Sequence, residues 1–149
     1  MYKENIYKFI TMSVLKKYYG KCVYAIKHSD TLNEIIDKKE ITQLEEKKIW
    51  RTAKMILAEA NNADQSVAIF FAPAEGTIFL HSFAELVSVD IKAESRTTIY
   101  QIRNLNVLPP NIRKSSLLML DGKNISPDFI RSYTLCRTPY SILNLGESV

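Results

Sequence analysis

The chain has 149 residues, of which 46% are hydrophobic and 24% charged, a balance typical of a folded domain and unlike disordered or collagen-like chains. A chain of this length can bury enough surface to form a core without disulfides or metals, so we expect one domain over residues 1–149. The first residues lack a secretory signal, and no apolar run is long enough to cross a bilayer, so a cytoplasmic protein without a membrane partner is expected. Cys22 and Cys136 are far apart in sequence and form no CxxC motif, so we expect no disulfide framework, metal site or cofactor.

Residues 1–65 are predicted to be mainly helical. Apolar residues at four-residue steps indicate a helix over 6–18, and 22–26 is a short β-prone run. The capping-box spacing Thr31-Leu-Asn-Glu34 predicts a short helix through Ile36. The same spacing in Thr42-Gln-Leu-Glu45 predicts a longer helix to about Ala60, with Trp50 beside its apolar side and therefore in the core.

Residues 66–149 are predicted to be rich in β-strands, because the apolar period changes there from 3.6 to 2. Strands are expected at 66–71, 77–83, 84–92 and 97–103, with turns at 72–76 and 93–96. Short turns between consecutive strands indicate an antiparallel meander, since parallel pairing needs a longer crossover. The alternation would place Glu85, Val87, Val89 and Ile91 on one face of their strand, and Thr98, Tyr100 and Ile102 on one face of theirs.

The last third of the chain mixes turns and short elements. A short helix is expected at 113–120, followed by a turn at Asp121-Gly122-Lys123. Ser126-Pro127 has the pattern of an N-cap followed by proline, which predicts a helix through about Tyr133. A last strand is expected within 134–143. Together these elements predict an α+β fold in which N-terminal helices pack on a strongly coiled, mainly antiparallel sheet or a small barrel.

Basic residues are concentrated in one part of the chain. The net charge is +4, but residues 96–137 carry seven basic and two acidic residues, and five of the six arginines fall in this window. Arginine presents a planar fork that matches phosphate and also stacks on aromatic rings. This pattern indicates a phosphate or nucleic-acid surface. The alternative is that some of these arginines pair with acidic residues of the N-terminal helices.

Catalytic signals are weak by comparison. His28-Ser-Asp and His81-Ser-Phe place Asp30 and Phe83 where paired-histidine phosphoesterases have Ser or Thr two residues after the histidine. Cys136 follows Leu135 in an apolar strand, which favours packing over nucleophilic chemistry. We therefore favour a non-enzymatic protein and name no catalytic residue.

Residues 66–140 resemble the PUA-like barrel superfamily, which includes the ASCH and EVE domains. The likeness lies in Val67-Ala-Ile-Phe-Phe-Ala72 before a turn, in Ala84-Glu-Leu-Val-Ser-Val-Asp-Ile91, and in Arg96-Thr-Thr-Ile-Tyr-Gln-Ile-Arg-Asn-Leu105 with its closing Asn-Leu step. The segment from Asp128 to Pro139 is similar to a final helix and strand packed on the barrel. The resemblance implies a PUA-like barrel and a reader of RNA or DNA, commonly one bearing a modified or flipped base.

The leading hypothesis is thus a nucleic-acid-binding module that uses an arginine-rich face. RNA, DNA and small nucleotides all remain open as ligands. The alternative is a protein-binding adaptor or inhibitor, for instance in bacterial or phage defence or counter-defence, whose basic face meets an acidic partner. The candidate binding residues are cations that contact phosphates and polar or aromatic groups that contact bases, namely Arg96, Thr97, Tyr100, Arg103, Arg113, Lys114, Arg131, Tyr133 and Arg137.

Overall fold

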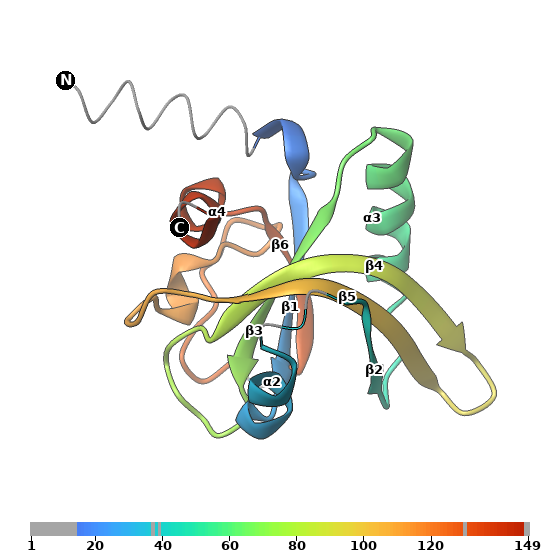
Figure 1. Ribbon diagram of the computed structural model, residues 1–149, viewed down its shortest axis with the longest axis horizontal. Helices are drawn as coiled ribbons and strands as arrows, with labels where there is room; N and C mark the ends of the chain where they lie inside the picture. The colour runs from blue at the N-terminus through green and yellow to red at the C-terminus, as the bar shows by residue number, and fades with distance from the viewer. Residues whose placement is uncertain (1–14, 37, 39, 130, 148–149) are drawn as a thin grey trace.

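The computed structural model describes residues 15–36, 38, 40–129 and 131–147 (Figure 1). Most of the helix expected over 6–18 lies outside these residues. None of the described helices is both long and apolar enough to cross a membrane. In chain order the elements are β1 (Lys21–Lys27), α2 (Ser29–Ile35), β2 (Thr42–Glu46), α3 (Arg51–Asn62), β3 (Val67–Pro73), β4 (Ser82–Lys92), β5 (Thr97–Val107), the 3-10 turn η1 (Lys114–Ser116), β6 (Tyr133–Arg137) and α4 (Tyr140–Glu147).

The strands form one six-stranded sheet in the order β2-β5-β4-β3-β1-β6. Every neighbouring pair is antiparallel except β1 and β3, which are parallel. The antiparallel pairing expected for consecutive strands is confirmed in β3, β4 and β5. The separate strand expected at 77–83 is wrong, because β4 runs as one strand from Ser82 to Lys92 and residues 77–81 belong to the loop before it. The parallel pair was not expected, and it is possible because α2, β2 and α3 form a long crossover between β1 and β3. The chain is thus α+β with a mostly antiparallel sheet.

The alternation expected for β5 is confirmed, whereas the one expected for β4 is right for Val89 and Ile91, which share a face, and wrong for Leu86. Thr98, Tyr100 and Ile102 are all buried on one side of β5. In β4, Leu86 and Val89 belong to the same core cluster although they are three residues apart. The pairing of β4 with β5 has irregularities between Phe83 and Glu85 and between Leu86 and Ser88. Such a bulge moves the following side chains to the other face, which a strict period of two cannot anticipate.

The largest correction concerns residues 42–60, which were expected to be one helix. Residues Thr42–Glu46 are strand β2, and α3 begins only at Arg51. A capping-box spacing is a local signal, and here pairing with β5 overrides it. Lys27 of β1 also holds the end of β2, because its ammonium group donates to the Glu45 carbonyl and pairs with the Glu46 carboxylate, both at 2.8 Å.

Three other expected boundaries were also wrong. The helix α2 begins at Ser29, two residues before the expected cap. The helices expected at 113–120 and 126–133 reduce to η1 and to a turn at 127–128. The last strand ends at Arg137 and is followed by α4 rather than continuing toward residue 143.

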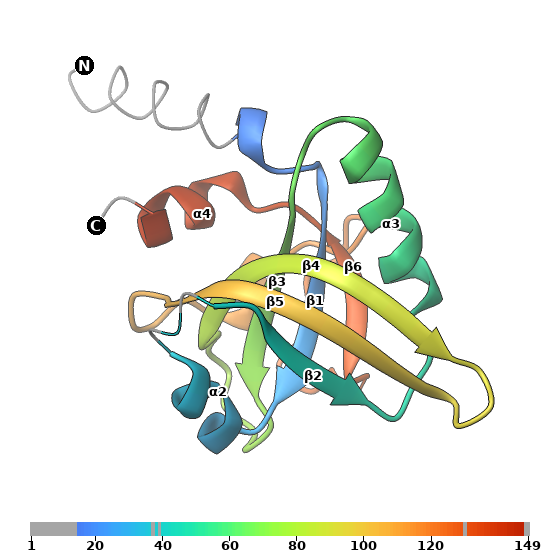
Figure 2. The ribbon, with the colours of Figure 1, turned by 45° about the vertical axis from the view of Figure 1, so that its right-hand side comes forward.

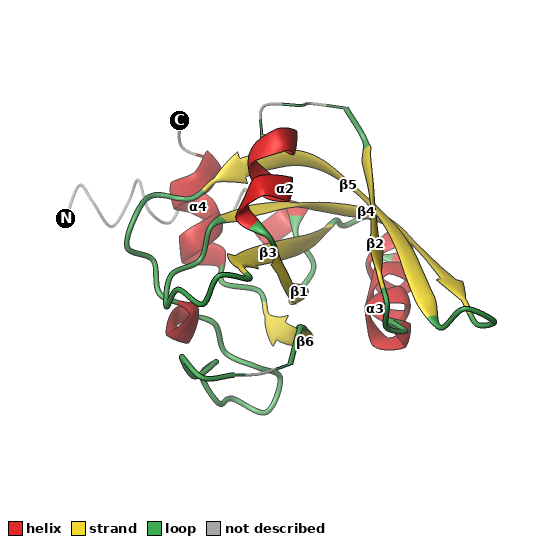
Figure 3. Cartoon of the chain, turned by 90° about the horizontal axis from the view of Figure 1, so that it is seen from below, coloured by secondary structure: helices red, strands yellow, loops and turns green. Residues whose placement is uncertain are grey.

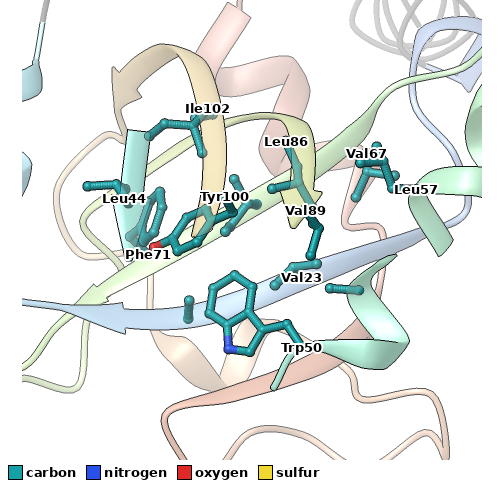
Figure 4. Packing of buried hydrophobic residues seen from close by; sticks show 14 of the residues in the cluster. Val23, Leu44, Trp50, Leu57, Val67, Phe71, Leu86, Val89, Tyr100 and Ile102 are labelled. Carbon is teal, nitrogen blue, oxygen red and sulfur yellow. The ribbon is translucent and has the colours of Figure 1, made fainter. Parts of the chain in front are cut away.

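Two clusters of buried side chains lie on the two faces of the sheet. One contains Trp50, Leu57 of α3 and residues of α2, β4 and β5 (Figure 4). The other contains Phe70, the α4 residue Leu143 and residues of the segment between β5 and β6. Both clusters combine residues from before and after position 65. Trp50 is 0% exposed, which confirms its prediction as a core residue.

The sheet is strongly curved, so that its two ends approach one another (Figures 2 and 3). Trp50 stacks on Tyr100 of β5 and on Tyr133 of β6, with ring centroids 4.4 Å and 4.7 Å apart and interplanar angles of 27° and 12°. Side chains therefore connect the β2–β5 end of the sheet with the β6 edge. The strand order itself remains that of an open sheet with two edges, β2 and β6.

Candidate functional site

The structure distributes the predicted binding residues over four places. Arg96 and Thr97 are at the turn between β4 and β5, Arg103 is in the middle of β5, and Arg113 and Lys114 are at η1. The turn and η1 lie at opposite ends of the molecule (Figures 1 and 3). Arg131, Tyr133 and Arg137 form the fourth group, in and just before β6.

Two of the predicted residues are buried. Tyr100 is 0% exposed, and burial, reinforced by the Glu46 carboxylate, raises the pKa of its hydroxyl well above the usual range. Lys114 is 5% exposed, and desolvation lowers the pKa of its ammonium group. Arranged in this way, neither side chain presents its surface to a large ligand.

Arg103 is held by a carboxylate of the neighbouring strand. Its Nε donates to Oε2 of Glu85 at 3.0 Å, and Lys17 pairs with Oε1 of the same carboxylate at 3.1 Å. Glu85 is only 7% exposed, so the two cations neutralise a carboxylate that the fold has buried. The alternative in which some arginines pair with acidic residues thus holds for Arg103, although its partner lies in β4 and not in an N-terminal helix.

A pocket of about 390 Å³ lies beside β6, and we call it the β6 pocket. Its wall combines the first turn of α3, the turn after η1 and the outer part of β6. It is lined by Thr52, Met119, Leu120, Asp121, Arg131, Tyr133, Thr134 and Leu135. It is an open hollow at the surface and not an enclosed cavity, so a ligand held there would remain partly exposed.

Tyr133 is the aromatic wall of the β6 pocket, and its ring is fixed from two directions. Trp50 covers one face of the ring, as described above. The Tyr133 hydroxyl accepts the Ala53 N–H at 3.0 Å and shares a hydrogen bond with the Thr52 hydroxyl. These bonds cap the first turn of α3. Tyr133 is thus a lining residue whose side chain is held by contacts on two sides.

The turn over residues 119–123 forms the opposite wall. The Met119 N–H donates to the Lys123 carbonyl at 2.8 Å, and the Lys123 N–H donates to Oδ1 of Asp121 at 2.9 Å. Gly122 has φ +89°, a left-handed conformation that favours glycine. The Asp121 carboxylate is thus held by its own turn, as aspartates commonly are.

The Arg137 side chain contacts this turn and stabilises it. Its Nη2 donates to the Leu120 carbonyl at 3.4 Å, and a Cβ added to Gly122 would come within 3.2 Å of the same nitrogen. Arg137 therefore places a positive charge next to the turn without itself lining the pocket. The lining residues include one cation, Arg131, and one carboxylate, Asp121.

Of the predicted binding residues, Arg131 and Tyr133 line the β6 pocket, whereas the other lining residues were not singled out from the sequence. Thr52 was assigned to the middle of a longer helix, and no sequence pattern relates it to Tyr133, 81 positions away. The turn at Asp121 was predicted from the sequence, and this was the one sequence feature that pointed to the pocket wall over residues 119–123. Leu135 was noted only as part of an apolar strand.

The cysteines are neighbours, contrary to what their separation in sequence suggested. Cys22 of β1 and Cys136 of β6 are directly opposite in the antiparallel register, and both are free and 0% exposed. Burial raises the pKa of the Cys136 thiol to about 12 and that of Cys22 well above its usual range. Both thiols are therefore protonated at neutral pH, which does not suit a nucleophile.

The two histidines have different hydrogen-bond or ion-pair partners, although the Glu75 carboxylate lies near both. His28 lies 3.7 Å from the Glu75 carboxylate, which also accepts the Ser29 N–H at 2.8 Å and so caps α2. His81 is hydrogen-bonded through Nε2 to Asn33 at 3.2 Å. Within the described ranges, no group of three or more His, Cys, Asp or Glu side chains is arranged to hold a metal ion.

Comparison with known proteins does not identify a family for this chain. No protein-family model and no curated protein matches the chain. Among solved structures, the chain is similar to a Lon N-terminal domain protein from Xanthomonas campestris, with a TM-score of 0.39 and 9% identity over 71% of this chain. The match spans 56% of the length of that protein. A likeness at this level assigns neither a family nor a function, and the PUA-like resemblance stays a prediction.

Proposed function

We propose that this protein binds single-stranded nucleic acid at the β6 pocket. The observation that carries the proposal is the meeting of Arg131 and the fixed ring of Tyr133 in one hollow, with Arg137 behind it. The three residues were singled out from sequence for this role, and they come from the window with the highest positive charge.

The chemistry of the pocket suits an unpaired base next to a phosphate. An aromatic face contributes about 1–3 kcal/mol per stacked base, and a ring that is already fixed loses little entropy on binding. Arginine at the rim supplies the phosphate contact. A base inside a duplex has both faces covered by its neighbours, so only an unpaired or flipped base can reach Tyr133. The resemblance of residues 66–140 to PUA-like barrels supports the same class of ligand.

Fluorescence anisotropy with a labelled single strand of about 12 nucleotides tests the proposal, using RNA and DNA at about 50 and about 200 mM salt. Wild-type protein should bind measurably at the lower salt. Arg131→Ala should weaken binding to all sequences alike and reduce the salt slope by about 0.7, the value for one phosphate of a single strand. Arg96→Ala is the matched control, because Arg96 is exposed at the far turn between β4 and β5.

Two results would count against the proposal. Absence of binding at low salt would exclude nucleic acid as the ligand and favour the protein-partner alternative. Equal losses from Arg131→Ala and Arg96→Ala would mean that the ligand senses only the overall charge of the protein and does not occupy the β6 pocket.

Tyr133→Leu tests the stacking contact separately from charge. It should weaken binding by about 1–3 kcal/mol while leaving the salt slope unchanged, because a base contact releases no counterions. Since Tyr133 also caps α3, the variant's folded state must be verified by circular dichroism before binding is compared.

A further inference from the structure

Asp121 lines the β6 pocket, but the proposed contact with a phosphate gives it no role. It is the one carboxylate among the lining residues of this pocket. A carboxylate is an acceptor only, and it repels a phosphate placed next to it. Whatever occupies the Asp121 side of the pocket must therefore present hydrogen-bond donors.

The carboxylate is held in place before any ligand arrives. Oδ1 accepts the Lys123 N–H at 2.9 Å, and the turn that carries it is supported by Arg137. With Oδ1 tied to the backbone, Oδ2 and the remaining lone pair of Oδ1 can accept hydrogen bonds from a ligand. Fixed acceptors of this kind discriminate between ligands more sharply than a mobile side chain does.

Nucleobases differ in the donors that they offer to such a carboxylate. Guanine presents two adjacent donors, its ring N1–H and its 2-amino group, which match the two oxygens of one carboxylate. Adenine and cytosine present an amino group beside an unprotonated ring nitrogen, and uracil presents one N–H between two carbonyl oxygens. An acceptor pair therefore favours guanine and disfavours uracil most, because carbonyl oxygens would face the carboxylate.

The other lining residues supply the remaining contacts that a nucleotide needs. Tyr133 is aromatic, Leu120 and Leu135 are apolar, and Arg131 carries a cation for a phosphate. From this arrangement we propose that the β6 pocket selects guanine, with Asp121 as the specificity-determining residue. The inference rests on the proposed function, since it assumes that a nucleotide occupies this pocket.

Titration of ¹⁵N-labelled protein with the monophosphates of guanosine, adenosine, cytidine, uridine and inosine tests the inference by NMR. Resonances of the 119–123 turn and of β6 should shift, and guanosine monophosphate should bind about 5-fold or more tightly than the others. Inosine monophosphate is the sharpest comparison, because it keeps the N1–H of guanine and lacks only the 2-amino group.

The variant Asp121→Asn should remove this preference, since its amide replaces one acceptor by a donor. Asp128→Asn is the matched control, because Asp128 is exposed, is bonded to Ser126 at 2.7 Å and does not line the pocket. It should keep the preference. The amide spectrum of each variant reports whether the protein remains folded.

The outcomes separate this inference from the proposed function. Equal affinity of wild type for all five monophosphates, or a guanine preference that survives in Asp121→Asn, would overturn the selection of guanine. Either result would leave the proposed function standing if oligonucleotides bind in an Arg131-dependent manner. Loss of oligonucleotide binding itself would instead remove the proposed function.

Discussion

The inner strand β5 and the edge strand β6 carry similar residues and use them differently. In β5, Tyr100 and Arg103 were predicted to meet a ligand, yet one is in the core and the other neutralises buried Glu85. At β6, Tyr133 in the strand and Arg131 just before it have the same side-chain chemistry and line a pocket. The difference follows from position in the sheet, because β5 is flanked by β2 and β4 whereas β6 is an edge strand. Arginine and tyrosine in a strand thus become candidates for binding only where the fold leaves them uncovered.

Truncating the two tyrosines should give the largest contrast between these regions. Tyr100→Ala should lower the free energy of unfolding by about 3–5 kcal/mol, since it removes a buried ring that packs on Trp50. Tyr133→Ala should lower it by about 1–3 kcal/mol, because that ring is only half-buried. Urea denaturation measures both. Equal losses in the free energy of unfolding would show that Tyr133 of β6 belongs to the core as fully as Tyr100 of β5.

Removing Arg103 should affect folding and leave ligand binding unchanged. Arg103→Ala is expected to lower the free energy of unfolding by about 1–2 kcal/mol, because buried Glu85 keeps only Lys17 as a partner. The loss is moderate since the arginine itself is well exposed.

A double-mutant cycle with Glu85→Gln isolates this ion pair. In the anisotropy experiment, Arg103→Ala should retain the wild-type salt slope. A reduced slope would place Arg103 among the ligand contacts, and the contrast between β5 and β6 would fail.

Removal of single tyrosine hydroxyls should give the smallest changes in the free energy of unfolding. We expect a loss of stability for Tyr133 and either no change or a gain for Tyr100. Tyr133→Phe removes the acceptor of the Ala53 N–H and should cost about 1 kcal/mol, as loss of a helix cap does. Tyr100→Phe should leave stability unchanged or raise it, because its buried hydroxyl has no hydrogen-bond partner among the described residues. Thermal denaturation of the two variants side by side measures the difference. A larger loss for Tyr100→Phe would contradict this account of the stack.

Local signals in the sequence were sufficient for much of the sheet. The apolar run before Pro73 and the period-two pattern after Thr97 predicted β3 and β5, and the short turns predicted antiparallel pairing of neighbouring strands, although two strands were expected where the structure has only β4. The sequence also placed Trp50 in the core and the turn at Asp121. Each of these features depends on residues that are neighbours in the chain, and composition and periodicity report on such neighbours directly.

The helix boundaries depended on distant partners instead. Trp50 is the N-cap residue of α3 without a side-chain cap bond of its own. Its N–H donates at 2.9 Å to the Thr98 hydroxyl, which donates at 2.6 Å to the Lys48 carbonyl, while Tyr133 accepts the Ala53 N–H. A capping signal read within a few residues cannot include groups from β5 and β6.

The sequence by itself therefore determined the strand-rich second half, its antiparallel order and the types of residue available for binding. Only the tertiary structure decided which of them meet. The strand β2 exists because it pairs with β5 despite a helix-start pattern, and the β6 pocket exists because Thr52, Asp121 and Tyr133 converge from separate segments. Periodicity shows which face of its own element a residue occupies, but exposure depends on what packs against that face. Trp50 stacks on both Tyr100 and Tyr133, yet Tyr100 is fully buried in an inner strand while Tyr133 stays half-buried in the edge strand β6.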